Sequence, residues 1–145
     1  MGLNAVVYRS RERLNIDVES LGAVRDDLTG EYYFPTPEHD GKFPRDIFIA
    51  KNFRIGNITG VAELREELSA LLQGNHSILL EKCFYSGSHS GDLMEIVSLP
   101  ALESEISTLL ERRKLALSPY LLSVLRGMLE LVETAKTENN PIVFV

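Results

Sequence analysis

A helix start is encoded at Ser118 and Pro119, in the last quarter of the 145-residue chain. A serine side chain can accept a hydrogen bond from a free amide of the first turn, and proline fits the first helical position because no amide donor is needed there. The pattern predicts a long amphipathic helix that ends before Asn139 and needs another layer to cover its apolar face. Its apolar positions are Leu121, Leu122, Leu125, Met128, Leu129 and Val132.

Two further segments have the same helical periodicity. One spans residues 59–73 and is followed by Gly74 and Asn75, which tolerate the left-handed backbone of a helix end. The other begins at residues 98–100, and we expect Leu102, Ile106, Leu109 and Leu110 to face inward. The sequence therefore predicts three main helices.

Short apolar or aromatic segments between turn residues predict β-strands. Residues 26–30, which include two aspartates and a glycine, suit the turn of a hairpin. Residues 46–53 fit either a strand or a short buried helix. The combination predicts a single α+β domain over residues 1–145, a mostly antiparallel sheet with three main helices packed on it. The expected strands are residues 3–8, 23–25, 31–34, 78–85, 93–97 and 142–145.

The charge balance excludes two classes of partner. Fifteen Lys and Arg residues stand against twenty-one Asp and Glu residues, for a net charge of -6. Binding to nucleic acid or to an anionic membrane surface requires clustered positive charge, so neither is expected. The single Cys83 cannot form an internal disulfide, and no secretory signal or membrane-spanning run is visible. We therefore expect a cytoplasmic protein.

The most unusual stretch is residues 85–92, which carry hydroxyl, imidazole and carboxylate groups between two glycines. Such a loop can turn its amides into an anion-binding concavity, with the imidazole as a second donor or a proton source. The alternative is a polar hairpin connection whose side chains satisfy their own backbone. The candidate binding residues here are Tyr85, Ser86, Ser88, His89, Ser90 and Asp92.

No complete catalytic or metal-binding pattern is present. Ser88, His89 and Asp92 are too close in sequence for a hydrolase triad, which is assembled from separate elements, and no G-x-S-x-G motif occurs. The three histidines lack the spacing of a zinc site. Cys83 is expected to be a small core residue. The sequence thus predicts no catalytic residue, no metal and no cofactor.

The proline-rich residues 35–44 form a second candidate binding loop through His39 and Asp40. The alternative is a rigid surface excursion held by its three prolines.

The negative charge is unevenly distributed. Residues 59–145 contain seven basic and twelve acidic side chains, a net charge of -5. Glu63, Glu66 and Glu67 share one face of the first predicted helix. They form either a solvated surface or a patch complementary to a basic protein partner, where charge speeds encounter and rejects wrong partners.

Along its whole length the chain resembles a family of small, uncharacterised bacterial proteins. The segments that carry the resemblance are residues 1–8 (MGLNAVVY), 54–57 (RIGN), 85–92 (YSGSHSGD) and 140–145 (NPIVFV). In size and acidity such proteins are similar to immunity proteins, which neutralise toxins delivered between bacteria. The resemblance supplies no catalytic or toxin-contact residue.

Two functions are therefore expected from the sequence. The first is a non-enzymatic, acidic protein-binding domain, of the immunity-protein kind, with a basic partner. The alternative is a small-ligand or phosphate-binding domain, with or without catalytic activity, centred on His89 and Asp92.

Overall fold

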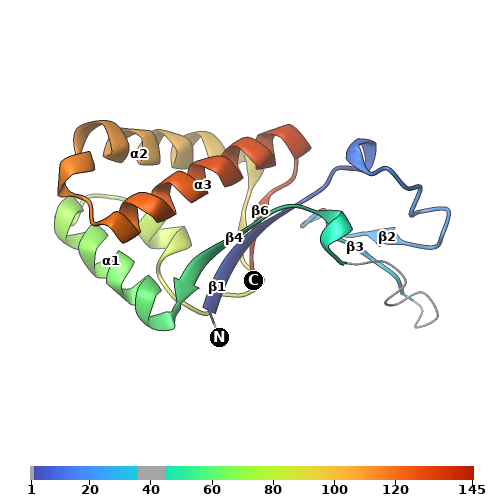
Figure 1. Cartoon of the computed structure of the whole chain (residues 1–145), viewed down its shortest axis with the longest axis horizontal. Helices are drawn as coiled ribbons and strands as arrows, with labels where there is room; N and C mark the ends of the chain where they lie inside the picture. Colours follow the sequence, from blue (N-terminus) through green and yellow to red (C-terminus); the bar gives the residue numbers. More distant parts are fainter. Residues whose placement is uncertain (1, 36–44) are drawn as a thin grey trace.

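The computed structural model describes residues 2–35 and 45–145. A four-stranded sheet has the order β4-β1-β6-β5, and each neighbouring pair is antiparallel. Three helices cover one face of this sheet (Figure 1). The predicted α+β class, with three main helices on an antiparallel sheet, is confirmed. The elements are β1 (Gly2–Tyr8), β4 (Ile49–Asn57), α1 (Ile58–Leu72), β5 (Leu93–Met94), α2 (Leu99–Arg112), α3 (Pro119–Glu138) and β6 (Ile142–Phe144).

Alternation along β1 assigns its side chains to two faces. Leu3, Ala5 and Val7 belong to the main core between the sheet and the helices. Val6 and Tyr8 point the other way and pack with Val143 of β6. Because all five are buried, the sheet is covered on both faces in this region.

The predicted helices are confirmed with small shifts at their ends. The side chain of Ser118 accepts a hydrogen bond from the amide of Leu121 at 3.1 Å, as expected of an N-cap. Asn57 caps α1 in the same way, through the amide of Gly60 at 2.7 Å. Helix α1 ends at Leu72, and its C-cap is Gln73, one residue before the predicted glycine, with a left-handed φ of 50°.

The strand predicted over residues 78–85 is wrong, since Leu79–Cys83 form a turn of π-helix. The cause is a contact from α2. The carboxylate of Glu105 accepts a hydrogen bond from the amide of Ile78 at 2.8 Å, and it also accepts from the hydroxyl of Ser77. These bonds satisfy amides at the start of the turn, which a sheet would otherwise have to pair.

Two other segments divide differently from the prediction. The expected strand over residues 93–97 is limited to β5, and Ile96–Ser98 form a 3-10 helix that leads into α2. The ambiguous residues 46–53 contain both alternatives. Arg45–Phe48 form a 3-10 helix, and β4 begins directly after it.

Between β1 and β4 the chain leaves the helical body and forms a projection, here called the lobe (residues 9–35 and 45–48). It contains the predicted hairpin, β2 (Val24–Arg25) paired with β3 (Tyr32–Tyr33), and lies at the far end of the molecule from α1 (Figure 1). Its own small core includes Val18, Tyr32 and Phe48, with 5.9 Å between the two ring centroids.

Buried polar side chains join the lobe to the body. Glu138, at the end of α3, accepts hydrogen bonds from the amide and the hydroxyl of Ser10, at 2.7 and 2.8 Å. Asn140 donates to the carbonyl of Tyr8 at 2.9 Å and accepts from the guanidinium of Arg25 at 2.7 Å. The orientation of the lobe therefore depends on the last residue of α3 and on a residue just after it.

Candidate functional site

The 85–92 loop is held against the last strand of the sheet. The amide of Gly91 donates to the carbonyl of Phe144 at 2.7 Å, and the amide of Phe144 donates to the carbonyl of Asp92 at 2.9 Å. Two further bonds lie within the loop: the amide of Ser88 donates to the hydroxyl of Ser86, and the amide of Asp92 donates to the carbonyl of His89. These three loop amides are not available to an anion.

His89 is an interior residue of this loop. Its side chain is 3% exposed and lies between the rings of Tyr85 and Phe144, with centroid separations of 4.4 and 4.6 Å. Its Nε2 donates to the carbonyl of Cys83 at 2.9 Å, because a carbonyl oxygen can only accept. Its Nδ1 lies 3.4 Å from Asp92 Oδ2, outside hydrogen-bond geometry, and the hydroxyl of Tyr85 donates to the same oxygen.

This geometry favours the structural interpretation of the loop. The imidazole is buried between two rings, and its Nε2 already has a backbone partner. Ser90 and Asp92 are exposed, but the three hollows described on the protein surface are lined by no residue of the loop. The structure therefore brings Tyr85, His89 and Asp92 together around a packing contact with β6.

The other candidate ligand groups are His39, Asp40 and Cys83. His39 and Asp40 lie outside the described residues. Among the described residues, no group of three or more His, Cys, Asp or Glu side chains could hold a metal ion. Cys83 is fully buried, as expected of a core residue, and burial raises the pKa of its thiol.

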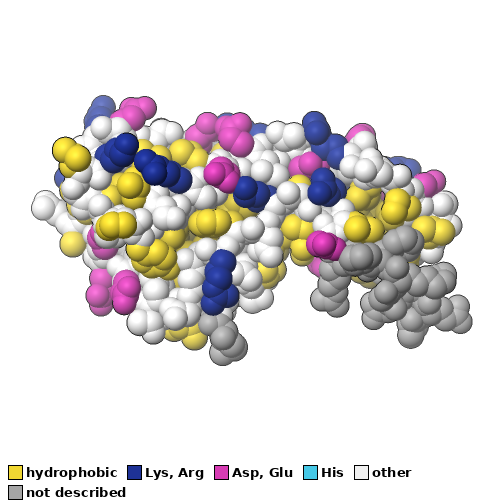
Figure 2. All heavy atoms as spheres, in the orientation of Figure 1, with side chains coloured by type: hydrophobic (Ala, Val, Ile, Leu, Met, Phe, Trp, Pro, Cys, Tyr) yellow, Lys and Arg dark blue, Asp and Glu magenta, His cyan; other side chains and the backbone are white. Residues whose placement is uncertain are grey.

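The acidic face of α1 divides into two parts. Both carboxylate oxygens of Glu67 accept hydrogen bonds at 2.8 Å from Ser118, one from its amide and one from its hydroxyl. Glu67 thus holds the start of α3 against α1. Glu63 and Glu66 are exposed, and neither has an ion pair with a described residue. Acidic side chains are visible over α1 at the lower left of Figure 2.

Exposed apolar and aromatic side chains flank these two glutamates. Tyr85 is 42% exposed, and its carbonyl accepts a hydrogen bond from Arg65 of α1 at 2.8 Å. Tyr120 is 36% exposed on the other flank, where its hydroxyl donates to the carbonyl of Ile55 at 2.7 Å. Burial, followed by the charge of Glu63, raises the pKa of Tyr120. We call this region the α1 surface; it consists of Ile58, Glu63, Glu66, Tyr85 and Tyr120.

The hollows on the surface of the described residues include three that bear on the search for a site. One of about 480 Å³ lies between β4 and α3. The other two are in the lobe, on either side of residues 14–18, and measure about 320 and 270 Å³. Sequence reasoning missed both lobe hollows, although the hairpin that contributes Tyr32 to one of them was predicted. The available signal was the alternation of Tyr32 and Tyr33, which directs one of the two rings inward.

Comparison with known proteins adds no relative to these observations. A scan against protein-family models, a search of curated proteins and a search of solved structures each find no match. Within residues 2–35 and 45–145, no helix has both the length and the apolar character needed to cross a membrane. The functional argument therefore rests on the side chains described above.

Proposed function

We propose that the chain is a non-enzymatic protein-binding domain that binds a basic protein through the α1 surface. The observation that carries the proposal is the placement of exposed Glu63 and Glu66, without ion-pair partners among the described residues, beside exposed Tyr85 and Tyr120. The engaged carboxylate of Glu67 is not part of this surface.

This arrangement combines the two chemistries that protein recognition uses. Tyrosine rings anchor interfaces because they bury a large area at a small cost in conformational entropy. Acidic side chains beside them steer a basic partner and disfavour an acidic one. Both tyrosine rings are oriented by their hydroxyls, which donate to the carboxylate of Asp92 and to the carbonyl of Ile55, so little order has to be gained on binding.

The finer form of the proposal is an immunity protein whose basic partner is a toxin. It is supported by the resemblance of the chain to small acidic bacterial proteins and by the net charge of -6. An acidic inhibitor that covers a basic toxin gains a fast encounter from this charge. The reaction that the toxin performs does not enter the proposal.

The test compares two charge reversals of equal size. The full chain carrying a purification tag is expressed in its native cell, and a stoichiometric basic partner is expected to co-purify. Glu63→Lys/Glu66→Lys should weaken binding of that purified partner at least about tenfold at low salt, with a smaller difference at high salt. Glu95→Lys/Glu133→Lys changes two exposed carboxylates elsewhere and should bind as the wild type does.

Two results would contradict the proposal: recovery of no stoichiometric partner, or equal weakening by both double variants. Thermal unfolding of each variant verifies that the fold is retained. For the immunity form, expression of the partner alone should arrest growth, and co-expression of the wild-type chain should restore it. Protection by Glu63→Lys/Glu66→Lys equal to that by the wild type would remove the α1 surface from the mechanism.

A further inference from the structure

Strand β4 forms one edge of the four-stranded sheet, with β1 on its inner side. Asn4 of β1 exchanges two backbone hydrogen bonds, of 2.8 and 2.9 Å, with the residue that follows β6, so its backbone groups face β6. Because this direction alternates along an antiparallel strand, the backbone groups of Ala5 face β4, where Phe53 lies opposite. The amides and carbonyls of Asn52 and Arg54, on either side of Phe53, therefore point out of the sheet, where they can pair with another strand.

Helix α3 lies beside this edge and runs in the opposite direction to β4 (Figure 1). At one end the hydroxyl of Tyr120 donates to the carbonyl of Ile55 at 2.7 Å, and at the other Lys51 pairs with Glu130 at 2.6 Å. The hollow of about 480 Å³ lies between these two contacts. We call it the β4 groove; its lining includes Phe53, Pro119, Leu122, Arg126, Gly127 and Glu130.

The β4 groove combines an apolar wall with one uncompensated cation. Phe53 and Leu122 are half-buried in the wall. The charge of Glu130 is offset by Lys51, whereas Arg126 is exposed and has no ion pair with a described residue. The remaining charge is therefore positive, on a chain whose net charge is -6.

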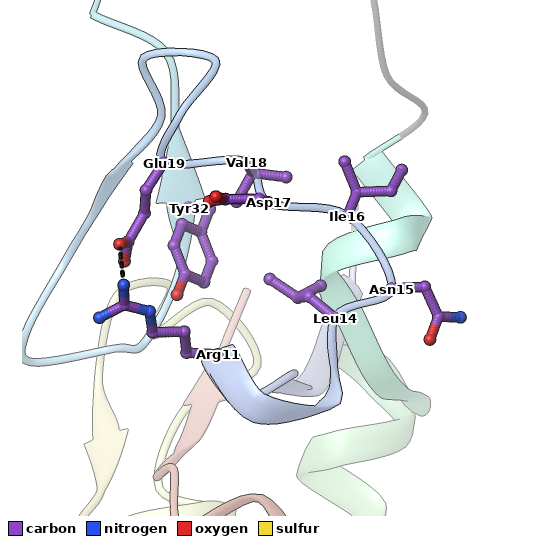
Figure 3. Close-up of a pocket in the computed structure, with 8 residues that line it drawn as sticks. All are labelled: Arg11, Leu14, Asn15, Ile16, Asp17, Val18, Glu19 and Tyr32. Atoms are coloured by element: carbon purple, nitrogen blue, oxygen red, sulfur yellow. Dashed lines mark ion pairs between the residues drawn. The ribbon is translucent and has the colours of Figure 1, made fainter.

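The hollow around Tyr32 in the lobe differs in this respect. Residues 11–19 fold over the Tyr32 ring, and the arginine among them, Arg11, pairs with Glu19 at 2.7 Å (Figure 3). The cation in that lining is thus already compensated by its neighbour.

We propose that the β4 groove binds an extended segment of a partner protein as an added strand, with an apolar residue at its centre and an Asp or Glu two positions away. The main chain of the segment pairs with Asn52 and Arg54. Its central residue lies opposite Phe53, whose ring faces Gly127 of α3, so the apolar side chain enters the hollow from the same face. Side chains two positions apart share a face, which brings the acidic group to Arg126.

The site shares no residue with the α1 surface. It therefore stands independently of the proposed binding of a basic protein.

The test uses synthetic heptapeptides with blocked ends. The sequence TETLTET reads the same in both directions, so it assumes no strand orientation. Each peptide is titrated into the full chain while backbone amide NMR shifts are recorded. TETLTET should give saturable shifts in β4 and α3. Three variant peptides should each bind at least about tenfold more weakly: TKTLTKT with reversed charge, TETSTET without the apolar side chain, and TETLTET N-methylated at the two threonines beside leucine.

Variants of the protein test the same contacts from the other side. Asn52→Pro removes an outward amide that the sheet does not use, and it should weaken TETLTET binding at least about tenfold while the fold is retained. Asn52→Ala keeps that amide and should bind as the wild type does. Arg126→Glu should weaken binding by a similar factor, whereas Lys114→Glu, an exposed position outside the groove, should not.

Several results would overturn the proposal. They are absence of saturable TETLTET shifts, equal binding of TKTLTKT or of the N-methylated peptide, and unchanged binding by Arg126→Glu. Should Asn52→Pro fail to fold, the N-methylated peptide decides the role of the edge. Self-association without peptide that Asn52→Pro abolishes would assign the edge to a second copy of the chain and also overturn the proposal. Glu63→Lys/Glu66→Lys should bind TETLTET as the wild type does, so this test and the test of the α1 surface can fail separately.

Discussion

Gly127 of α3 lies against the ring of Phe53 in β4. A Cβ atom at this position would be 2.1 Å from Cζ of the ring, far inside van der Waals contact. Glycine in the interior of a helix costs about 1 kcal/mol relative to alanine, so propensity alone disfavours it. The close approach of α3 to β4 offsets this cost and explains why a residue without a side chain stands in the middle of the longest helix.

Replacing this glycine should have opposite effects in two backgrounds. In the wild-type sequence, Gly127→Ala forces the Phe53 ring to move and should lower the free energy of unfolding by about 1 kcal/mol net. In a Phe53→Ala background the clash is absent, and the same change should raise the free energy of unfolding by about 1 kcal/mol through helix propensity. Urea unfolding of the four proteins measures both values. A stabilising Gly127→Ala in the wild-type sequence would show that the ring does not restrict this position.

At the scale of elements, α1 and α3 are joined by a capping arrangement that uses both helices. Ser118 accepts from the third residue of α3, Leu121, and its own amide and hydroxyl donate to Glu67. One carboxylate on α1 therefore orients the residue that begins α3. This explains why three glutamates that share a helix face in the sequence differ in role.

Alanine substitution of these glutamates should separate the roles. Glu67→Ala should lower the free energy of unfolding by about 2 kcal/mol, because two hydrogen bonds to a charged group are lost. Glu63→Ala and Glu66→Ala provide matched controls on the same helix and should change it by less than about 0.5 kcal/mol. Denaturant midpoints give the comparison. Equal losses in all three variants would contradict a distinct structural role for Glu67.

A helix or strand could be predicted from the sequence where the residues that determine it are neighbours in the chain, and not where a distant residue determines it. The start of α3 was predicted because Ser118 and Pro119 are adjacent, and the capping bond is present. The strand over residues 78–85 was predicted wrongly, because a short apolar run fits a strand and a buried helix equally well. What favours the helical turn is Glu105, more than twenty residues away, which accepts from its first amides.

Contacts between residues that are distant in sequence also determine the candidate sites. Residues 85–92 were identified from composition, but the burial of His89 results from Phe144, a residue of the last strand. The lobe hollow depends on the segment at Arg11 folding over Tyr32, a contact that neither residue type signals alone. Sequence patterns identify polar residues, whereas the tertiary fold determines which of their atoms are buried and which of them have a hydrogen-bond partner.

At the scale of the molecule, the lobe and the helical body have separate cores. The lobe core contains Val18, Ala23, Tyr32 and Phe48, and it is much smaller than the main core. The hydrogen bonds of Glu138 and Asn140 are therefore important for holding the lobe against the helical body. A region with few buried apolar side chains is expected to open locally at a lower free energy than the main sheet.

Asn140→Ala should weaken this coupling. The substitution removes the acceptor of Arg25 and a donor at the junction, and it should lower the opening free energy of the lobe by about 2 kcal/mol. Amides of the β2–β3 hairpin should then exchange with solvent deuterium roughly thirtyfold faster, while amides of β6 change little. Asn75→Ala, at an exposed position of the body, is the control. Equal acceleration in the hairpin and in β6 would mean that the lobe does not open on its own.

The central pair of strands has a consequence for the order in which the protein is built. Val6 of β1 pairs with Val143 of β6, while the other edge of β1 pairs with β4. A ribosome makes β1 more than a hundred residues before β6, so β1 and β4 can pair early but the middle of the sheet stays open until residues 142–144 are made. Closure then requires a short strand to insert between β1 and β5, a non-local step that slows folding and leaves strand edges exposed in the meantime. For the nascent chain, the period before residues 142–144 emerge is the time at which help from a chaperone matters most.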